Sequence, residues 1–149
     1  MGLYWHDFEV GQVFESPART VTEADIVAFT GLSWDSNPLH TDEEQARRGP
    51  FGGRIAHGAL GIAIVTGLLG RLGHLDGTAL AMLGIDEWRF HQPIFPGDTV
   101  HVRMTIEGTR ASKTPGRGVL DRRVELVNQH GAVVQSGRVP VLVKGLIDA

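Results

Sequence analysis

The chain of 149 residues has the length of one domain, and 42% of its residues are hydrophobic, which suffices for one sizeable core. Its net charge of −3 argues against a protein whose main role is to bind nucleic acid phosphates, and its lack of cysteine excludes disulfides, a thiolate nucleophile and cysteine-ligated zinc. We therefore interpret residues 1–149 as a single domain of a cytoplasmic protein that binds no nucleic acid.

The first part of the chain predicts a strand followed by a helix. The strand is expected over 13–21, with a break at Ser16 and Pro17. Thr22 begins the helix, because Asp25 follows it at the spacing of a capping box and apolar residues follow in turn. This helix should end near residue 31.

A long apolar helix is predicted in the middle of the chain. It is preceded by an irregular polar stretch over 32–41 and a short helix over 42–48. The segment 56–72 is apolar on nearly every face, so the helix should be covered on all sides. Its most apolar part, 58–70, is interrupted by four glycines and is shorter than the ~20 residues that cross a bilayer, so we expect no membrane association.

Alternating apolar residues after residue 78 predict half-buried antiparallel strands. In the first segment the residues that share one face are Leu80, Met82, Trp88 and Phe90. In the next segment they are Val100, Val102, Met104 and Ile106. Further strands are expected over 119–127 and 133–143, with turns at 96–98, 114–116 and 130–131. Helices followed by a meander of strands favour an α+β architecture in which one antiparallel sheet curls around one apolar helix.

The charge is unevenly distributed along the sequence. Residues 1–100 hold six basic and 13 acidic side chains, whereas residues 101–149 hold eight and four. A solvated sheet surface accounts for the basic C-terminal third, and attraction of an anionic group on a substrate is the alternative. The candidate cations for the second interpretation are Arg103, Arg110, Lys113, Arg117, Arg122 and Arg123.

The clearest chemical signal lies in the irregular stretch, where Asp35 and His40 are five residues apart. Pro38 fixes its own φ angle and favours an extended Asn37, so the loop can hold the two groups in fixed positions. A carboxylate beside an imidazole can bind a water molecule and move its protons at neutral pH. The same residue types also make ordinary turns, which is the structural alternative.

A second signal lies at the start of the long apolar helix, around His57 and Gly58. Free backbone N–H groups at a helix start stabilise negative charge. A glycine at this position lets a substrate carbonyl approach the backbone closely.

These motifs together resemble the MaoC-like dehydratases, also called (R)-specific enoyl-CoA hydratases. The resemblance rests on Asp35-x-Asn37-Pro38-x-His40 followed 17 residues later by His57-Gly58. It extends more loosely to Phe8-x-Val10-Gly11 and to Phe90-x-x-Pro93-Ile94-x-x-Gly97-Asp98.

The resemblance implies a hot-dog fold, in which an antiparallel sheet wraps around a long central helix, assembled as a homodimer or a higher homo-oligomer. It implies reversible syn hydration of a trans-2-enoyl-CoA to a (3R)-3-hydroxyacyl-CoA. No metal or cofactor is expected, because coenzyme A enters as part of the acyl thioester substrate. An acyl-carrier-protein thioester and branched or dicarboxylic acyl groups stay open as substrates.

By motif position, Asp35 and His40 would be the catalytic pair, Gly58 would donate the oxyanion-hole N–H, and Asn37 would support the loop. The family often has Ser or Thr eight residues after this glycine, and Thr66 takes that place here. A threonine on a buried helix also commonly bonds its own backbone, which is the alternative for Thr66.

Two aromatic residues near the motif have less certain roles. Trp34 replaces the small residue that many relatives have before the aspartate; it either reshapes the substrate pocket or, as we expect, packs in the core. His57 would contact the substrate or orient the loop. The other histidines follow no ligand spacing and are interpreted as background: His6, His74, His91, His101 and His130.

Three other functions are considered. An acyl-CoA thioesterase of this fold would use a carboxylate or glutamine from the central helix, and residues 56–72 contain no Asp, Glu, Asn or Gln. A non-catalytic subunit that binds acyl thioesters is disfavoured by the intact Asp35 and His40. A metal site of Asp35, His40 and His57 would have the two-histidine, one-carboxylate composition, and we rank it lowest.

Overall fold

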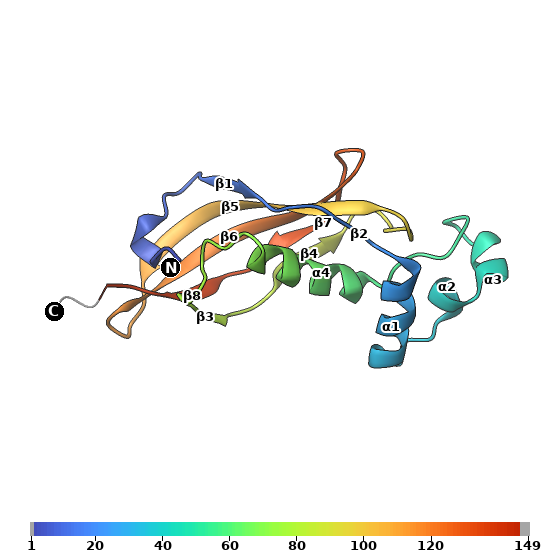
Figure 1. The fold of residues 1–149 in the computed structure, drawn as a ribbon, viewed down its shortest axis with the longest axis horizontal. Helices are drawn as coiled ribbons and strands as arrows, with labels where there is room; N and C mark the ends of the chain where they lie inside the picture. The colour runs from blue at the N-terminus through green and yellow to red at the C-terminus, as the bar shows by residue number, and fades with distance from the viewer. Residues whose placement is uncertain (1, 147–149) are drawn as a thin grey trace.

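The computed structural model describes residues 2–146 of the chain (Figure 1). Its elements are the 3₁₀ helix η1 (Trp5–Asp7), β1 (Val13–Glu15), β2 (Arg19–Thr20), α1 (Glu23–Ser33), α2 (Pro38–Thr41), α3 (Glu43–Arg47), α4 (Gly58–Gly70), β3 (Ala79–Met82), β4 (Asp86–Phe90), β5 (Thr99–Ala111), β6 (Arg117–Asn128), β7 (Val133–Arg138) and β8 (Val141–Lys144). The helices α1, α2 and α3 gather at one end of the sheet, away from both termini (Figure 1).

All described strands belong to one antiparallel sheet. The main path is β1-β5-β6-β7-β4, while β2 also pairs with β5, and β8 pairs with β6 and β3. The long β5–β6 hairpin forms the centre of the sheet, with Gly116 at a φ of 70° in the turn between the two strands. The predicted turns at 96–98, 114–116 and 130–131 are confirmed.

The core lies between the sheet and α4. Val100, Val102, Met104 and Ile106 alternate along β5 and are all buried, as their parity predicts. They cluster with Leu60, Ile64 and Leu68 of α4 and with Leu120, Val124 and Leu126 of β6. The predicted α+β arrangement of a sheet around an apolar helix is therefore confirmed.

The helix α4 is not covered on every side, contrary to our expectation. Within the described chain, Ala59, Ala63, Thr66 and Gly67 are exposed on one of its faces. The sheet curls around only part of the helix, so its small residues are left open to solvent. No helix in the described part of the chain is long and apolar enough to cross a membrane.

Two predicted strands differ in the structure. The segment 133–143 divides into β7 and β8 at Val139-Pro140, because proline has no N–H for the ladder and the chain changes partner there. In the segment 80–90, Leu80, Met82 and Phe90 are exposed rather than half-buried, since this edge has no described neighbour on its outer side.

The basic C-terminal third lies on the sheet, where several of its cations are paired with acids. Arg103 contacts Glu125 at 2.8 Å, and Arg138 contacts Glu107 at 3.1 Å. Arg110 lies 3.6 Å from Asp121. These ion pairs favour the interpretation of this segment as a solvated sheet surface.

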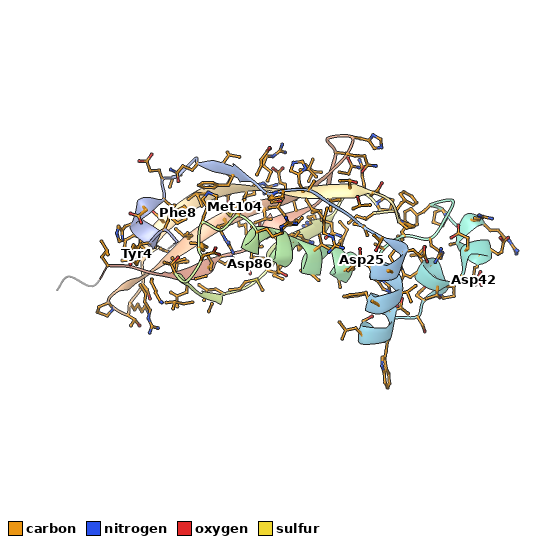
Figure 2. All side chains as sticks on the ribbon, in the orientation of Figure 1. Tyr4, Phe8, Asp25, Asp42, Asp86 and Met104 are labelled. Carbon is orange, nitrogen blue, oxygen red and sulfur yellow. The ribbon has the colours of Figure 1, made fainter. Side chains whose placement is uncertain are left out.

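The predicted capping box at the start of α1 is confirmed, and it positions the helix that leads to the candidate site. Thr22 accepts a hydrogen bond from the Asp25 N–H at 3.2 Å, and the Asp25 carboxylate accepts one from the Thr22 N–H at 2.8 Å. The same carboxylate pairs with Arg19 at 2.6 Å. Figure 2 shows Asp25 at the end of α1 that approaches the sheet.

Replacing Asp25 with alanine should lower the free energy of unfolding by about 1 kcal/mol at pH 7, because the variant loses the carboxylate that accepts from the Thr22 N–H and pairs with Arg19. Burial acts to raise the pKa of Asp25, but the bonds from Thr22 and Arg19 outweigh it and leave this pKa below its ordinary value of 3.8. The stabilisation is therefore present above pH 3.8 and is lost as the pH falls through the lower, folded-state pKa.

Urea unfolding of the wild-type protein and the Asp25→Ala variant, at pH 7 and at several values below pH 4, measures this difference. Glu9→Ala is the control, because it removes an exposed acid that caps no helix. A difference that stays constant with pH, or equal losses in both variants, would contradict the assignment.

Candidate active site

The loop after α1 is built by a chain of local turns. Trp34 ends the helix in the left-handed conformation, at a φ of 63°. The Asp35 carboxylate accepts a hydrogen bond from the Asn37 N–H at 3.3 Å, and the Asn37 side chain accepts one from the Leu39 N–H at 2.9 Å. Asn37 thereby caps α2, whose first residue is Pro38. The predicted support of the loop by Asn37 thus has a direct structural basis.

The short helix α2, which the sequence did not predict, places His40 beside Asp35. His40 is buried, whereas the Asp35 side chain is about half exposed. The His40 Nδ1–H donates to the Ile55 carbonyl at 2.7 Å, which in the neutral imidazole leaves Nε2 as an acceptor. This nitrogen lies 3.9 Å from Asp35 Oδ2. Two acceptors cannot form a hydrogen bond with each other, but one water molecule between them can donate a hydrogen bond to each.

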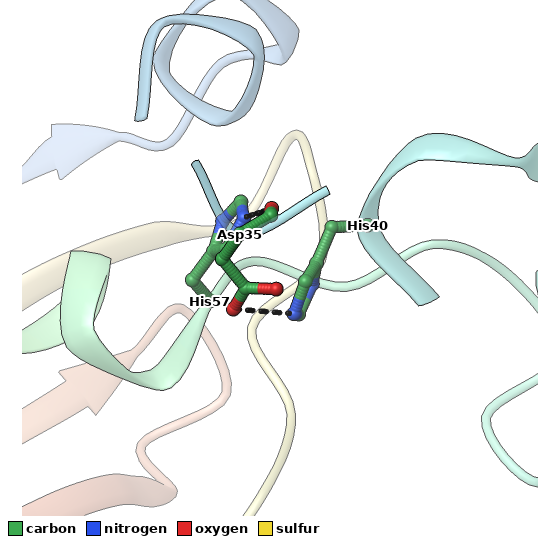
Figure 3. Close-up of side chains that lie close together, drawn as sticks. All are labelled: Asp35, His40 and His57. Atoms are coloured by element: carbon green, nitrogen blue, oxygen red, sulfur yellow. Dashed lines mark hydrogen bonds and ion pairs between the residues drawn. The ribbon is translucent and has the colours of Figure 1, made fainter. Parts of the chain in front are cut away.

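His57 fastens the loop to the start of α4. Its Nε2–H donates to the Asp35 carbonyl at 3.0 Å, and its ring stacks on that of His40 with centroids 3.9 Å apart (Figure 3). The ring of Phe29 packs 4.9 Å away. His57 is 2% exposed, and its Nδ1 has no hydrogen-bond partner among the described residues. These contacts link the loop to the start of α4, as the loop-orienting interpretation of His57 requires.

Gly58 is the first residue of α4, and its N–H has no acceptor within the described chain. The Gly58 carbonyl accepts a hydrogen bond from Gln135 Nε2 at 3.2 Å. A Cβ atom at this position would lie 2.7 Å from the Phe90 ring. A larger residue would have to displace the exposed Phe90 ring, and the site offers a backbone donor at a helix N-terminus.

His40 and Gly58 line the same cavity, which has a volume of about 420 Å³. Its other walls are mostly apolar, and they include Leu39, Phe51, Ile55, Phe90, Pro93 and Ile94. An apolar cavity with a few convergent polar groups is the usual form of a small-molecule site.

Arg54 ties the elements around the cavity together. Its guanidinium contacts both carboxylate oxygens of Glu23, at 2.5 and 3.0 Å, and Glu43 at 2.6 Å. These two acids hold its pKa above the ordinary value, and Arg54 in turn lowers the pKa of Glu43. The start of α1, the start of α3 and the segment before α4 are therefore joined by one charged cluster.

Trp34 and Thr66 do not take the places we expected. Trp34 is 89% exposed, so the expectation that it packs in the core is wrong; its left-handed backbone directs the indole outward at the end of α1. The Thr66 hydroxyl donates to the Ala63 carbonyl at 2.7 Å, and the residue lines a different cavity from that of His40. The alternative interpretation of Thr66 is therefore the one observed: its hydroxyl forms a hydrogen bond with the backbone of its own helix.

Sequence reasoning missed several residues that form the cavity. Gln135 comes from β7 and bonds both Gly58 and Trp88 Nε1. His91 was interpreted as background, but it lines the cavity and contacts the Ser136 hydroxyl at 2.8 Å. No spacing in the sequence could reveal these residues, because the pairing of β4 with β7 brings them to the cavity.

The side chains of Asp35, His40 and His57 offer one ligand atom each within 4.8 Å of one another. One nitrogen of each imidazole already donates to a backbone carbonyl. The two rings are stacked at an interplanar angle of 26°, so their remaining lone pairs do not converge on one point. This arrangement fits a metal ion poorly.

Comparison with known proteins gives the family. The MaoC-like domain family matches residues 7–128. A protein named MaoC from Klebsiella aerogenes is 38% identical over 104 residues, which are 70% of this chain but only 30% of that protein. An (R)-specific enoyl-CoA hydratase from Rhodospirillum rubrum is 37% identical over 105 residues, which are 70% of each chain.

Solved structures agree with this match. The MaoC-like dehydratase from Rhodospirillum rubrum has a TM-score of 0.87 at 35% identity, over 97% of this chain and 99% of that one. A Mycobacterium tuberculosis protein described as a double hot-dog fold has a TM-score of 0.84 at 23% identity, over 99% of this chain and 46% of that one, and it supports the fold alone. The chain belongs to the MaoC-like dehydratase family and has the α+β hot-dog fold.

Proposed function

We propose that the protein catalyses the reversible hydration of a trans-2-enoyl-CoA to a (3R)-3-hydroxyacyl-CoA. The observation that carries this proposal is the 3.9 Å separation of Asp35 Oδ2 and His40 Nε2, with His40 lining the same cavity as Gly58, whose N–H is free. The names of the relatives support the same class, since they include (R)-specific enoyl-CoA hydratase and 3-hydroxybutyryl-CoA dehydratase.

The Gly58 N–H would bind the thioester carbonyl oxygen. Water attack on the β carbon moves negative charge onto this oxygen, and the N-terminus of α4 stabilises that charge. A donor of this kind typically contributes a factor of ~10²–10³ to the rate. The mostly apolar walls of the cavity lower the local polarity, which strengthens the interaction.

Asp35 and His40 would hold the attacking water. The pair accepts one proton from the water as its oxygen bonds the β carbon, and it delivers one proton to the α carbon, so that it ends as it began. The Ile55 carbonyl orients the His40 ring throughout. These steps need no cofactor in addition to the coenzyme A of the substrate.

A thioesterase is the alternative within the same fold. Between its first and last residues, α4 carries no carboxylate or amide side chain that could attack or activate water at a thioester. Free coenzyme A released without a 3-hydroxyacyl product would favour this alternative. A protein that releases neither product but binds acyl-CoA would be a non-catalytic subunit.

Replacing Asp35 or His40 with asparagine should reduce crotonyl-CoA hydration by ~10²–10⁴-fold, because each variant removes a proton acceptor while keeping approximate shape. The loss of enoyl-thioester absorbance measures the rate. Glu44→Gln, an exposed change on α3, is the control and should keep wild-type activity. Near wild-type hydration by both folded site variants would refute the assignment.

His57 should act as a positioning residue that holds the Asp35 backbone. His57→Phe keeps a ring against His40 but loses the donor, and we expect kcat to fall by about 10- to 100-fold with little change in KM. His57→Gln can place an amide N–H near the same carbonyl and should restore part of kcat. If kcat and KM change together with the melting temperature, and glutamine restores nothing, His57 has only a structural role.

We also propose a homodimer formed through the β3–β4 edge. Leu83 and Ile85, which lie between β3 and β4, expose 51% and 37% of their surface there. An unpaired edge with exposed apolar residues favours pairing with another copy of the chain. Closed two-fold symmetry is the commonest form of such assembly.

Replacing Ile85 with glutamate should convert the dimer to a monomer, because it places a charge in the apolar edge. Light scattering coupled to size-exclusion chromatography gives the mass. Val13→Glu is the matched control, since Val13 is exposed on β1 at the opposite edge of the sheet. A monomeric wild-type protein, or a dimeric Ile85→Glu variant, would rule out this interface.

A further inference from the structure

An unusual buried cation lies far from the Asp35–His40 pair. Arg122 is only 6% exposed, and on β6 it shares the inner face with the buried residues Leu120 and Val124. Opposite it, the chain crosses from β7 to β8 at Val139 and Pro140, where the sheet is interrupted. The guanidinium therefore occupies a gap in the sheet rather than a regular core position.

The guanidinium has few protein partners. Its Nε donates to the Val139 carbonyl at 2.8 Å, and Nη1 lies 3.9 Å from the sulfur of Met104. Among residues 2–146, no carboxylate lies within ion-pair distance of it. Burial lowers the pKa of Arg122 to about 10, so it is still a cation at neutral pH. A buried charge of this kind is normally paired, because desolvation is costly.

Arg122 lines two cavities. The first also contains three acids, Asp86, Glu107 and Asp121, and one further cation, Arg138, which is paired with Glu107, so acids predominate in its lining. The second has a volume of about 460 Å³ and lies between the C-terminal half of α4 and β3. Its walls are largely apolar, including Leu69, Leu75, Leu80 and Met82; Arg122 is its only basic residue, and its only acid, Asp76, is exposed.

The geometry points to a binding site for a carboxylate with an apolar body in this second cavity, with Arg122 as the charge partner. Its volume falls within the usual ~300–1,000 Å³ range of small-molecule sites. The free N–H groups of the guanidinium match the two oxygens of a carboxylate. The apolar walls of α4 and β3 would bury the remainder of the ligand.

This carboxylate can belong to a separate molecule or to the far end of the substrate. The second possibility rests on the proposed function, because it requires that an acyl thioester bound at Gly58 also reaches Arg122. Gly58 and Thr66, one in each site, are eight residues apart, or about 12 Å along the helix. An extended acyl group with a terminal carboxylate could therefore span from the Gly58 N–H towards Arg122.

Octanoate binding to the full-length protein tests the site directly. We expect octanoate to raise the melting temperature and to bind in calorimetry, and octanamide, which has the same body without the charge, to bind at least about tenfold more weakly. Arg122→Met should weaken octanoate binding by about 10- to 100-fold. Arg123→Met is the matched control, because it removes the neighbouring, exposed charge from the same strand.

Equal binding of octanoate and octanamide to the wild-type protein would overturn the proposal even if Arg122→Met failed to fold. So would no octanoate binding, or an undiminished affinity in a folded Arg122→Met variant. Methionine is chosen because it is apolar and similar in length to arginine. Buried charges can often be replaced by apolar residues of similar volume without loss of stability.

Hydration of two ten-carbon thioesters separates the sources of the carboxylate. If the ligand is the substrate's far end, Arg122→Met should lower kcat/KM for the CoA monothioester of trans-2-decenedioic acid, joined at its C1 carboxyl, at least tenfold relative to kcat/KM for trans-2-decenoyl-CoA. If octanoate binding depends on Arg122 but Arg122→Met changes kcat/KM for the two thioesters equally, the ligand is a separate molecule. If no thioester is hydrated, the proposed function fails while the octanoate result still decides the site.

Discussion

The candidate site depends on a reciprocal pair of imidazole–carbonyl hydrogen bonds. His40 in the loop donates to the Ile55 carbonyl just before α4, and His57 at the start of α4 donates to the Asp35 carbonyl in the loop. The two rings stack between these bonds. Because each segment holds the other by a buried donor, neither can move without leaving a polar group unsatisfied, which costs about 1–3 kcal/mol per group.

This pair of hydrogen bonds determines the chemistry available to the site. The bond at Nδ1 leaves His40 Nε2 as an acceptor that faces Asp35, and the bond from His57 keeps the Asp35 backbone close to the N-terminus of α4. His40 and a backbone donor thereby line one cavity on a rigid support, and the half-exposed Asp35 side chain lies next to His40. Arg54 holds the surrounding helices by charge, so the support extends beyond the histidines.

The helix α4 contributes to the candidate site, to the core and to the cavity that contains Arg122. Its N-terminus offers a free N–H, its buried face packs on the sheet, and its C-terminal half lines the cavity that contains Arg122. Its remaining face carries small exposed residues, beside an apolar edge of the sheet. One element therefore contributes to the catalytic proposal, the carboxylate site and the proposed dimer.

The sequence by itself determined the elements and turns whose signals are local: the cap of α1 at Thr22, the alternation along β5, and the Asp35, His40, His57 and Gly58 motif. Tertiary structure alone decided which face of α4 is covered, the outward position of Trp34, the break at Pro140 and the arrival of Gln135 and His91 at the cavity. It also brought Arg122 to the gap between β7 and β8. Caps and periodicity depend on neighbours within a few residues, whereas burial and cavity lining depend on strand pairing between segments far apart in the chain.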